Sequence, residues 1–167
     1  MDKQELLEQL VEHFRHPRHR HAIADADVAM PGGNPGCGDI VTIYLKVDDA
    51  GQVVAEASFE GEGCTISQAA ADILLELVNE ERWTLERILA TDYHLMAELI
   101  GEEAVKLRPR CATLALGTLK AAATKYLRDR LRRDAGLEQV EEENQRFGIV
   151  TGEAVEQRSP GVDPRGA

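Results

Sequence analysis

Two neighbouring segments alternate apolar and polar residues, and this alternation constrains the fold more than any other feature. Apolar side chains occupy every second position in residues 41–47 and again in residues 53–59, and residues 48–51 between them have a turn composition. Alternation with a period of two places the apolar side chains on one face of a strand. The two segments therefore predict an antiparallel hairpin with one buried face, which the rest of the chain has to cover.

Helical patterns surround this hairpin. Asp2 and Glu5 form a capping pair before apolar residues at helical spacing, which predicts a first helix that ends near Pro17. After the hairpin, the T-x-x-Q sequence of residues 65–68 predicts a capping box and a helix to about residue 78. Pro109 suits the first position of a long helix to about residue 133, because its missing N–H would be unpaired there. Strands followed by helices predict an α+β fold.

The remaining segments are shorter or irregular. Residues 30–38 are rich in glycine and proline and predict a turn, and short helices are expected from Thr84 and Asp92. Beyond Gly136 the helical periodicity is lost, and acidic residues, glycines and prolines follow. We therefore expect one domain in residues 1–135 and an acidic, flexible tail in residues 136–167.

The composition excludes several classes of protein. The 167 residues carry 19 Lys and Arg against 30 Asp and Glu, a net charge of −11, so nucleic acid is not the expected partner. No apolar run approaches the roughly 18 residues that a membrane-spanning helix requires. The N-terminus is polar and lacks the pattern of a signal peptide. The sequence predicts a cytoplasmic protein without a membrane partner.

Three cysteines are the residues with the most chemical potential. Cys37, Cys64 and Cys111 are too few, and odd in number, for a disulfide scaffold in a reducing compartment. Such thiols are either small buried hydrophobic residues or ligands and nucleophiles, and their wide spacing leaves both readings open. Asp39 stands two residues after the first cysteine and adds a carboxylate that could face the same point.

Two of these cysteines lie where a helix is expected to begin. The positive end of the helix dipole favours a thiolate at Cys64 and Cys111, and Arg108 and Arg110 add positive charge beside Cys111. A nucleophilic thiol has to be exposed and has to have a low pKa. Cys111 therefore has the more favourable surroundings for a nucleophilic thiolate, with Cys64 as the rival.

The cysteine-containing segments resemble a known family. Residues 34–39 read N-P-G-C-G-D, residues 61–67 read G-E-G-C-T-I-S, and residues 110–114 read R-C-A-T-L. Together with residues 12–18, which read E-H-F-R-H-P-R, these motifs are similar to those of the U-type iron–sulfur assembly proteins (the IscU, NifU and SufU family). The resemblance covers roughly residues 5–130, with the motifs in the same order.

This resemblance implies a fold and a function. The implied fold is a small antiparallel sheet of about three strands packed with helices. The implied site receives iron, together with persulfide sulfur from a cysteine desulfurase, builds a [2Fe-2S] cluster and delivers it to apo-proteins. The chain would be a scaffold rather than a conventional enzyme. With the resemblance, Cys111 becomes the expected acceptor of the persulfide sulfur, and Cys64 is its rival. The resemblance implies these metal ligands: Cys37, Asp39, Cys64 and Cys111.

One position departs from the scaffold pattern. IscU-like scaffolds carry histidine immediately before the third cysteine, where this chain has Arg110, and a guanidinium cannot ligate a metal. Arginine there is more similar to the SufU branch, whose members bind zinc through the same ligands and accept persulfide sulfur. That branch carries an insertion between the second and third cysteines that the present chain lacks. A zinc-bound sulfurtransferase is therefore the alternative function.

Two further expectations complete the sequence-based picture. A metal-free interaction module with inert buried thiols is a third possibility from a different class. The N-terminal segment also carries several histidines next to arginines, and these are expected to form a solvated basic patch. The functional alternative is that this patch helps to dock an acidic partner surface, such as that of the desulfurase. The histidines of this patch are His13, His16, His19 and His21.

Overall fold

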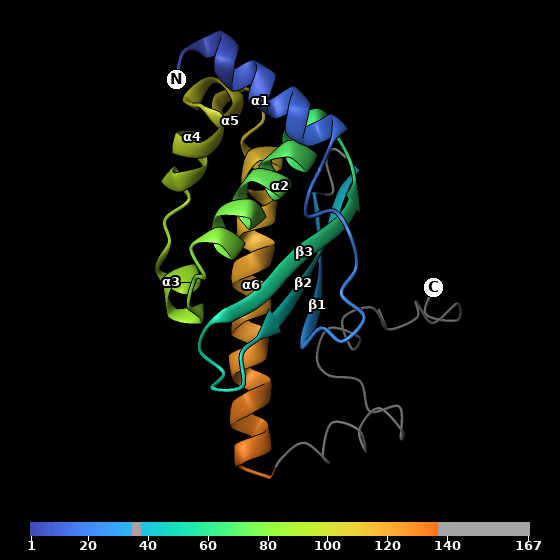
Figure 1. The fold of residues 1–167 in the computed structure, drawn as a ribbon, viewed down its shortest axis with the longest axis vertical. Helices are drawn as coiled ribbons and strands as arrows, with labels where there is room; N and C mark the ends of the chain where they lie inside the picture. Colours follow the sequence, from blue (N-terminus) through green and yellow to red (C-terminus); the bar gives the residue numbers. More distant parts are fainter. Residues whose placement is uncertain (35–37, 137–167) are drawn as a thin grey trace, which may run out of the picture. The chain divides into compact units, whose positions relative to one another are not determined.

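A computed structural model of the chain describes residues 1–34 and 38–136. The contacts within the chain divide it into two units, Met1–Tyr126 and Leu127–Ala167, and the strands and the candidate site belong to the first. Figure 1 shows the arrangement of the elements. In chain order they are α1 (Lys3–Arg15), β1 (Val28–Asn34), β2 (Asp39–Val47), β3 (Val54–Glu62), α2 (Thr65–Glu80), α3 (Leu85–Ala90), α4 (His94–Ile100), α5 (Glu102–Leu107) and α6 (Pro109–Asp134).

The three strands form one antiparallel sheet in the order β1-β2-β3, which confirms the predicted hairpin and the α+β fold. The inward face of β2 carries Val41, Ile43 and Leu45, all at most 2% exposed. Helix α2 packs on β3, and α6 approaches β1 on the same face. The helices therefore supply the covering layer that the one-sided alternation requires.

The strand β1 corrects the expectation of a turn over residues 30–38. Residues 30–34 extend as part of β1 and pair with β2, Met30 lying opposite Ile43. Pro31 is tolerated because β1 is an edge strand, where a missing N–H need not break the ladder. A Cβ at Gly32 would collide with the Thr118 side chain of α6, so a glycine lets the strand and the helix approach closely. Cys37, which the same expectation covered, lies outside the described residues.

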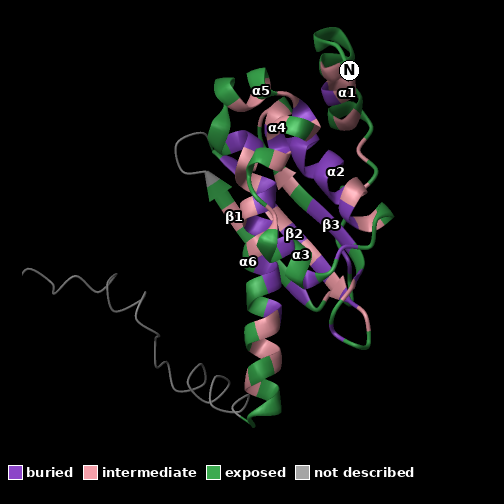
Figure 2. Cartoon of the chain, turned by 90° about the vertical axis from the view of Figure 1, so that its left-hand side faces the viewer, coloured by how far each residue is buried: buried purple, intermediate pink, exposed green. Residues whose placement is uncertain are grey.

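The helices begin largely where the sequence predicts. Asp2 and Glu5 form the expected capping box of α1, and Pro109 is the first residue of α6. The predicted capping box at residue 65 is wrong: the N-cap of α2 is Cys64, whose sulfur accepts the backbone N–H of Ser67. Helix α5 was not expected from the sequence. Figure 2 shows that α2 is buried along most of its length, which makes it the central helix of the first unit.

A buried carboxylate ties the N-terminal segment to α2. Asp72 is fully buried, and its Oδ1 accepts the backbone N–H groups of Arg18 at 2.9 Å and of His19 at 2.8 Å. Its Oδ2 lies 2.6 Å from Nδ1 of His13. His13 and His19 are thus structural residues, and the expectation of a wholly solvated histidine patch is wrong for them. His16 and His21 do lie at the surface.

Replacing His13 with alanine is expected to lower the free energy of unfolding by about 1–3 kcal/mol, because the fully buried Asp72 loses a hydrogen-bond partner. The matched control is His16→Ala, which removes an exposed imidazole paired with Glu12 on the same helix. This control should stay within about 0.5 kcal/mol of wild type. Urea unfolding followed by circular dichroism measures both, and equal values for the two variants would contradict the role of Asp72 as an anchor.

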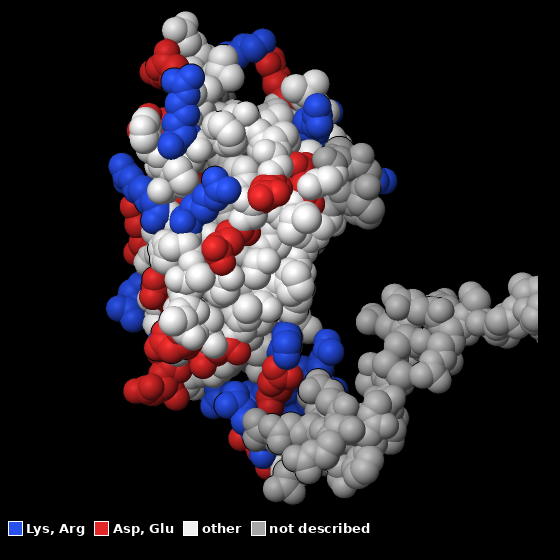
Figure 3. Space-filling model, turned by 90° about the vertical axis from the view of Figure 1, so that its right-hand side faces the viewer, with Lys and Arg blue, Asp and Glu red and all other residues white. Residues whose placement is uncertain are grey.

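The surface mixes charges of both signs. Figure 3 shows acidic and basic side chains spread around uncharged areas on one side of the chain. Pairs such as Lys3 with Glu103 are largely exposed and contribute little to stability. Within residues 1–34 and 38–136, no helix is at once long enough and apolar enough to cross a bilayer. A cytoplasmic location stays a prediction.

Candidate metal centre

Three elements bring their ends together at one end of the sheet. Asp39 is the first residue of β2, Cys64 follows the end of β3 and caps α2, and Cys111 lies in the first turn of α6. The antiparallel register pairs Ile40 with Glu62, so the start of β2 and the end of β3 are necessarily neighbours. The hairpin therefore places Asp39 beside Cys64, although 25 positions separate them in the sequence.

The carboxylate of Asp39 lies between the two sulfurs. The Cys111 thiol donates a hydrogen bond to Oδ2 of Asp39 at 2.7 Å, and Sγ of Cys64 lies 3.9 Å from the same oxygen. The other oxygen, Oδ1, accepts the backbone N–H of Cys64 at 2.8 Å, which fixes the orientation of the carboxylate. One ligand atom from each of the three residues lies within 4.8 Å of the other two. This set is compact enough to hold a single cation.

Protonation in this cluster is distributed unequally. Burial by itself would raise the pKa of Asp39, but the hydrogen bonds from the Cys111 thiol and the Cys64 N–H outweigh it and hold the pKa below its ordinary value of 3.8. Burial, together with the Asp39 carboxylate and Cys64, raises the pKa of Cys111 to about 12. At neutral pH a proton therefore sits between a sulfur and a carboxylate. A bound cation would replace that proton, which is how thiol ligands take up metals.

The two described cysteines differ in their surroundings. Cys111 is only 1% exposed, so the expectation of an exposed thiol with a low pKa is wrong for the structure as it stands. The helix N-terminus and the neighbouring arginines favour a lower pKa of Cys111, but burial and the nearby Asp39 carboxylate raise it by more. Cys64 is half-buried and is the more accessible of the two described thiols. Cys37 lies outside the described residues, and its place as a ligand stays a prediction.

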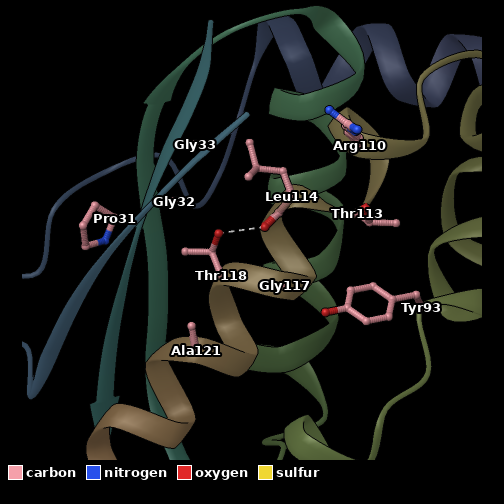
Figure 4. Close-up of a pocket in the computed structure, with 10 residues that line it drawn as sticks. All are labelled: Pro31, Gly32, Gly33, Tyr93, Arg110, Thr113, Leu114, Gly117, Thr118 and Ala121. Atoms are coloured by element: carbon pink, nitrogen blue, oxygen red, sulfur yellow. Dashed lines mark hydrogen bonds between the residues drawn. The ribbon is translucent and has the colours of Figure 1, made fainter. Parts of the chain in front are cut away.

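The two arginines beside Cys111 have different roles. Arg108 lies close enough to help lower the pKa of Asp39 by its charge. Arg110 instead lines an open pocket of about 540 Å³ between β1, Tyr93 and the exposed side of α6 (Figure 4). The floor of this pocket includes Leu114 and Gly117. Of the two arginines, Arg108 is therefore the one whose charge acts on the Asp39 carboxylate.

Two further residues shape the site, and sequence reasoning missed one of them, Ser67. Ser67 donates its backbone N–H to Sγ of Cys64 at 3.5 Å and its hydroxyl to the Cys64 carbonyl at 3.0 Å. At Gly63, a Cβ would come closer than 3.0 Å to both the Asp39 carboxylate and the Ser67 hydroxyl. The G-x-G-C sequence before a helix carried this signal, because glycine allows the close approach of backbone to a ligand.

A Cβ at Gly63 should therefore disturb the site directly. Gly63→Ala is expected to displace the Asp39 carboxylate and to weaken Zn²⁺ binding by about tenfold, the usual effect of altering groups that orient metal ligands. The control is Gly33→Ala, whose Cβ would lie 3.8 Å from the Asp39 carbonyl oxygen, an ordinary contact. Competition with a chromophoric chelator measures the two affinities. An unchanged affinity for Gly63→Ala would show that the carboxylate does not need its present position.

The donor chemistry of the cluster fits a metal. Thiolates suit zinc and iron–sulfur clusters, and a carboxylate is an accepted third ligand for zinc. A carboxylate is a harder and weaker partner for a cluster than a thiolate. Cys64 and Cys111 supply the sulfurs and Asp39 the oxygen, all three at the ends of regular elements. The described residues thus provide three of the four ligands expected from the sequence.

The comparisons with known proteins all indicate the same family. The sequence model of the NifU-like N terminal domain matches residues 6–133. The iron–sulfur cluster assembly scaffold protein IscU of Thermotoga maritima is 44% identical over 45% of this chain and 51% of its own length. IscU 1 of Archaeoglobus fulgidus is 32% identical over 72% of this chain and 76% of its own. The zinc-dependent sulfurtransferase SufU of Bacillus subtilis is 28% identical over 70% of this chain and 87% of its own.

A solved structure shares the fold. The crystal structure of the N-terminal part of a NifU-like protein from Brucella abortus superposes with a TM-score of 0.62 at 20% identity, covering 72% of this chain and 93% of that one. This chain spans only about half the length of the relative from Thermotoga maritima. The match of the domain over most of the chain is sufficient for one conclusion: this protein belongs to the NifU-like N-terminal domain family of iron–sulfur cluster assembly proteins.

Proposed function

We propose that this protein is a scaffold on which an iron–sulfur cluster is assembled and from which it is passed to apo-proteins. The observation that carries the proposal is the convergence of Asp39, Cys64 and Cys111, whose ligand atoms lie within 4.8 Å of one another. Cys37 is the proposed fourth ligand. Iron and sulfur are the cargo of this site, and the protein acts in the cytoplasm as a carrier rather than as a conventional enzyme.

Sulfur is proposed to arrive as a persulfide from a cysteine desulfurase. In the transfer step, a thiolate of the scaffold attacks the terminal sulfur of the desulfurase persulfide. A new S–S bond forms, the old one breaks, and the desulfurase cysteine leaves as a thiolate, so no external oxidant or reductant is needed. Cys111 is the acceptor proposed from the sequence. The half-buried Cys64 is the competing acceptor, because it is the more accessible thiol.

The carboxylate is proposed to keep the cargo labile. Iron–sulfur clusters prefer thiolate ligands, so the bond from Asp39 is the weakest of the set. Asp39 is 2% exposed and oriented by the Cys64 N–H, and it can hold this weak bond in a fixed direction. A donor protein needs such a ligand because a cluster held by thiolates alone would be released slowly.

The second candidate function is a zinc-bound sulfurtransferase. Three thiolates and one carboxylate make an acceptable closed tetrahedral zinc site. The resemblance to the zinc-dependent SufU of Bacillus subtilis supports this candidate, as does Arg110 immediately before Cys111. In this case the zinc would be a resident ion that holds and activates thiolates, and the transferred group would be sulfur alone.

Metal analysis of protein purified without oxygen separates the two candidates. A scaffold is expected to take up iron and sulfide, to develop the visible absorption of a [2Fe-2S] cluster, and to pass that cluster to an apo-ferredoxin. A zinc sulfurtransferase is expected to contain one zinc per chain and to stimulate a cysteine desulfurase without any chromophore. Cys64→Ser is the control, since it removes a ligand that both candidates need. A wild-type chain that binds neither metal would contradict both.

A further inference from the structure

One buried side chain close to the candidate metal centre has no partner for its polar atoms. Gln68 is 4% exposed, and neither its Nε2 nor its Oε1 makes a hydrogen bond to any described residue. Buried amides are nearly always hydrogen-bonded, because an unmade bond destabilises the fold. An amide left in this condition on the central helix calls for a ligand that completes it.

Gln68 lies on α2 about one turn after Cys64. It lies four residues after Cys64, and residues four apart are neighbours on one face of a helix. Side chains on a helix lean toward its N-terminus, so the long Gln68 side chain covers the turn that carries Cys64.

The opposite direction along α2 is already occupied. Asp72, four residues further on, uses Oδ1 for the backbone N–H groups of Arg18 and His19. Its Oδ2 lies 2.6 Å from His13. The carboxylate therefore has its own donors at both oxygens, and no described contact joins it to Gln68. What Gln68 lacks is an acceptor on the Cys64 side.

The sulfur of Cys64 is an acceptor with room for another donor. In the structure its Sγ receives one backbone N–H, that of Ser67, at the long distance of 3.5 Å. A sulfur that binds a metal or carries a persulfide becomes anionic and attracts further N–H donors. In a buried site such donors come from the protein, and the unpaired Nε2 of Gln68 is one turn away.

We propose that Gln68 is a positioning residue: its side-chain amide donates a hydrogen bond to the anionic sulfur held at Cys64 when the site is loaded. This inference rests on the proposed function and adds a residue to it. The amide orients Cys64 and stabilises its negative charge, and it touches neither iron nor zinc. The loaded site thus gives a partner to Nε2, one of the two amide atoms that have none among the described residues.

If Gln68 has this role, replacing it should raise the stability of the metal-free protein and lower its affinity for metal. Gln68→Met keeps the length and apolar volume of the side chain while removing both unpaired atoms. The variant is expected to unfold at a higher urea concentration than wild type in the presence of EDTA, because no buried amide is left unsatisfied. Its affinity for Zn²⁺ is expected to fall by about tenfold, as when other groups that orient metal ligands are removed. If Gln68 were purely structural, the substitution would not raise the urea midpoint in EDTA and at the same time lower the affinity for Zn²⁺.

The chain offers a matched control. Ser58 on β3 is fully buried, and its Oγ likewise makes no hydrogen bond to a described residue. Ser58→Ala should therefore also raise the urea midpoint in EDTA, but it should leave the Zn²⁺ affinity at the wild-type value. Zinc affinity is measured by competition with a chromophoric chelator, using the full-length protein in each case.

The outcomes are decisive for Gln68. A Zn²⁺ affinity of Gln68→Met within twofold of wild type would overturn the proposal. If that variant does not fold, Gln68→Glu replaces the donor by a charged acceptor, and its affinity should fall further; an unchanged affinity overturns the proposal equally. The metal site is tested separately: wild type should bind zinc, and Cys64→Ser should not. If these two results hold, an unchanged Zn²⁺ affinity of the Gln68 variants would overturn only the role of Gln68 and not the proposed function.

Discussion

Cys111→Ser is expected to lower the affinity for Zn²⁺ by about a hundredfold or more, because the variant loses one of the four proposed ligands and structural zinc sites bind with roughly 10–16 kcal/mol. The thiol is 1% exposed and lies 2.7 Å from Asp39 Oδ2, so no water can easily take its place. A hydroxyl keeps its proton at neutral pH and offers the metal a much weaker bond than a thiolate does. Chelator competition under anaerobic conditions measures the change.

The control for Cys111→Ser has to reproduce the insertion of a buried hydroxyl. Ala122→Ser does so about three turns further along α6, at a residue that is also fully buried. It is expected to lower the free energy of unfolding while leaving zinc affinity within about twofold of wild type, since it lies about three turns away from Cys111. If Cys111→Ser bound zinc as tightly as this control, Cys111 would not be a ligand.

Asp39→Ala is expected to slow transfer of a reconstituted [2Fe-2S] cluster to an apo-ferredoxin by about tenfold, the usual scale for altering groups around a metal. The reason is that the bond from the Asp39 carboxylate is the weakest of those proposed to hold the cluster. Without it, a stronger ligand would take its place and hold the cluster more tightly. The variant should also unfold more easily, because the buried donors of Cys64 and Cys111 lose their acceptor. Circular dichroism of the acceptor follows the transfer.

An aspartate directly after β2 provides the control for Asp39→Ala. Asp48, at the other end of the hairpin, accepts the backbone N–H groups of Gln52 and Val53. Asp48→Ala therefore removes a carboxylate with a similar bonding role but without a place at the metal centre. It should transfer its cluster at the wild-type rate. Equal transfer rates for the two variants would remove the case for Asp39 as the labile ligand.

Local sequence patterns predicted the elements that have a clear period or a clear cap. The alternation of residues 41–47 and 53–59 predicted β2 and β3, because one-sided burial requires it. Strand β1 was missed, because its glycines and Pro31 have the composition of a turn and only the neighbouring β2 and α6 make them a strand. Tertiary contacts overrode local preference there.

The candidate site was predicted in its residue types but not in its electrostatics. The motifs singled out Asp39, Cys64 and Cys111, and the structure brings these three together. Helix-dipole arguments predicted a reactive Cys111, yet burial and the Asp39 carboxylate raise its pKa to about 12. Neither factor is visible in a sequence, because both depend on which distant residue faces the thiol. The anchor at Asp72 was missed for the same reason.

The hairpin has a practical consequence for handling this protein. Since β2 begins and β3 ends at the metal centre, the turn at residues 48–51 lies a whole strand away, about 30 Å for nine residues. A fluorescent dye or an immobilisation tag grafted onto that turn would therefore report on the protein without obstructing the approach of other molecules to the sulfurs.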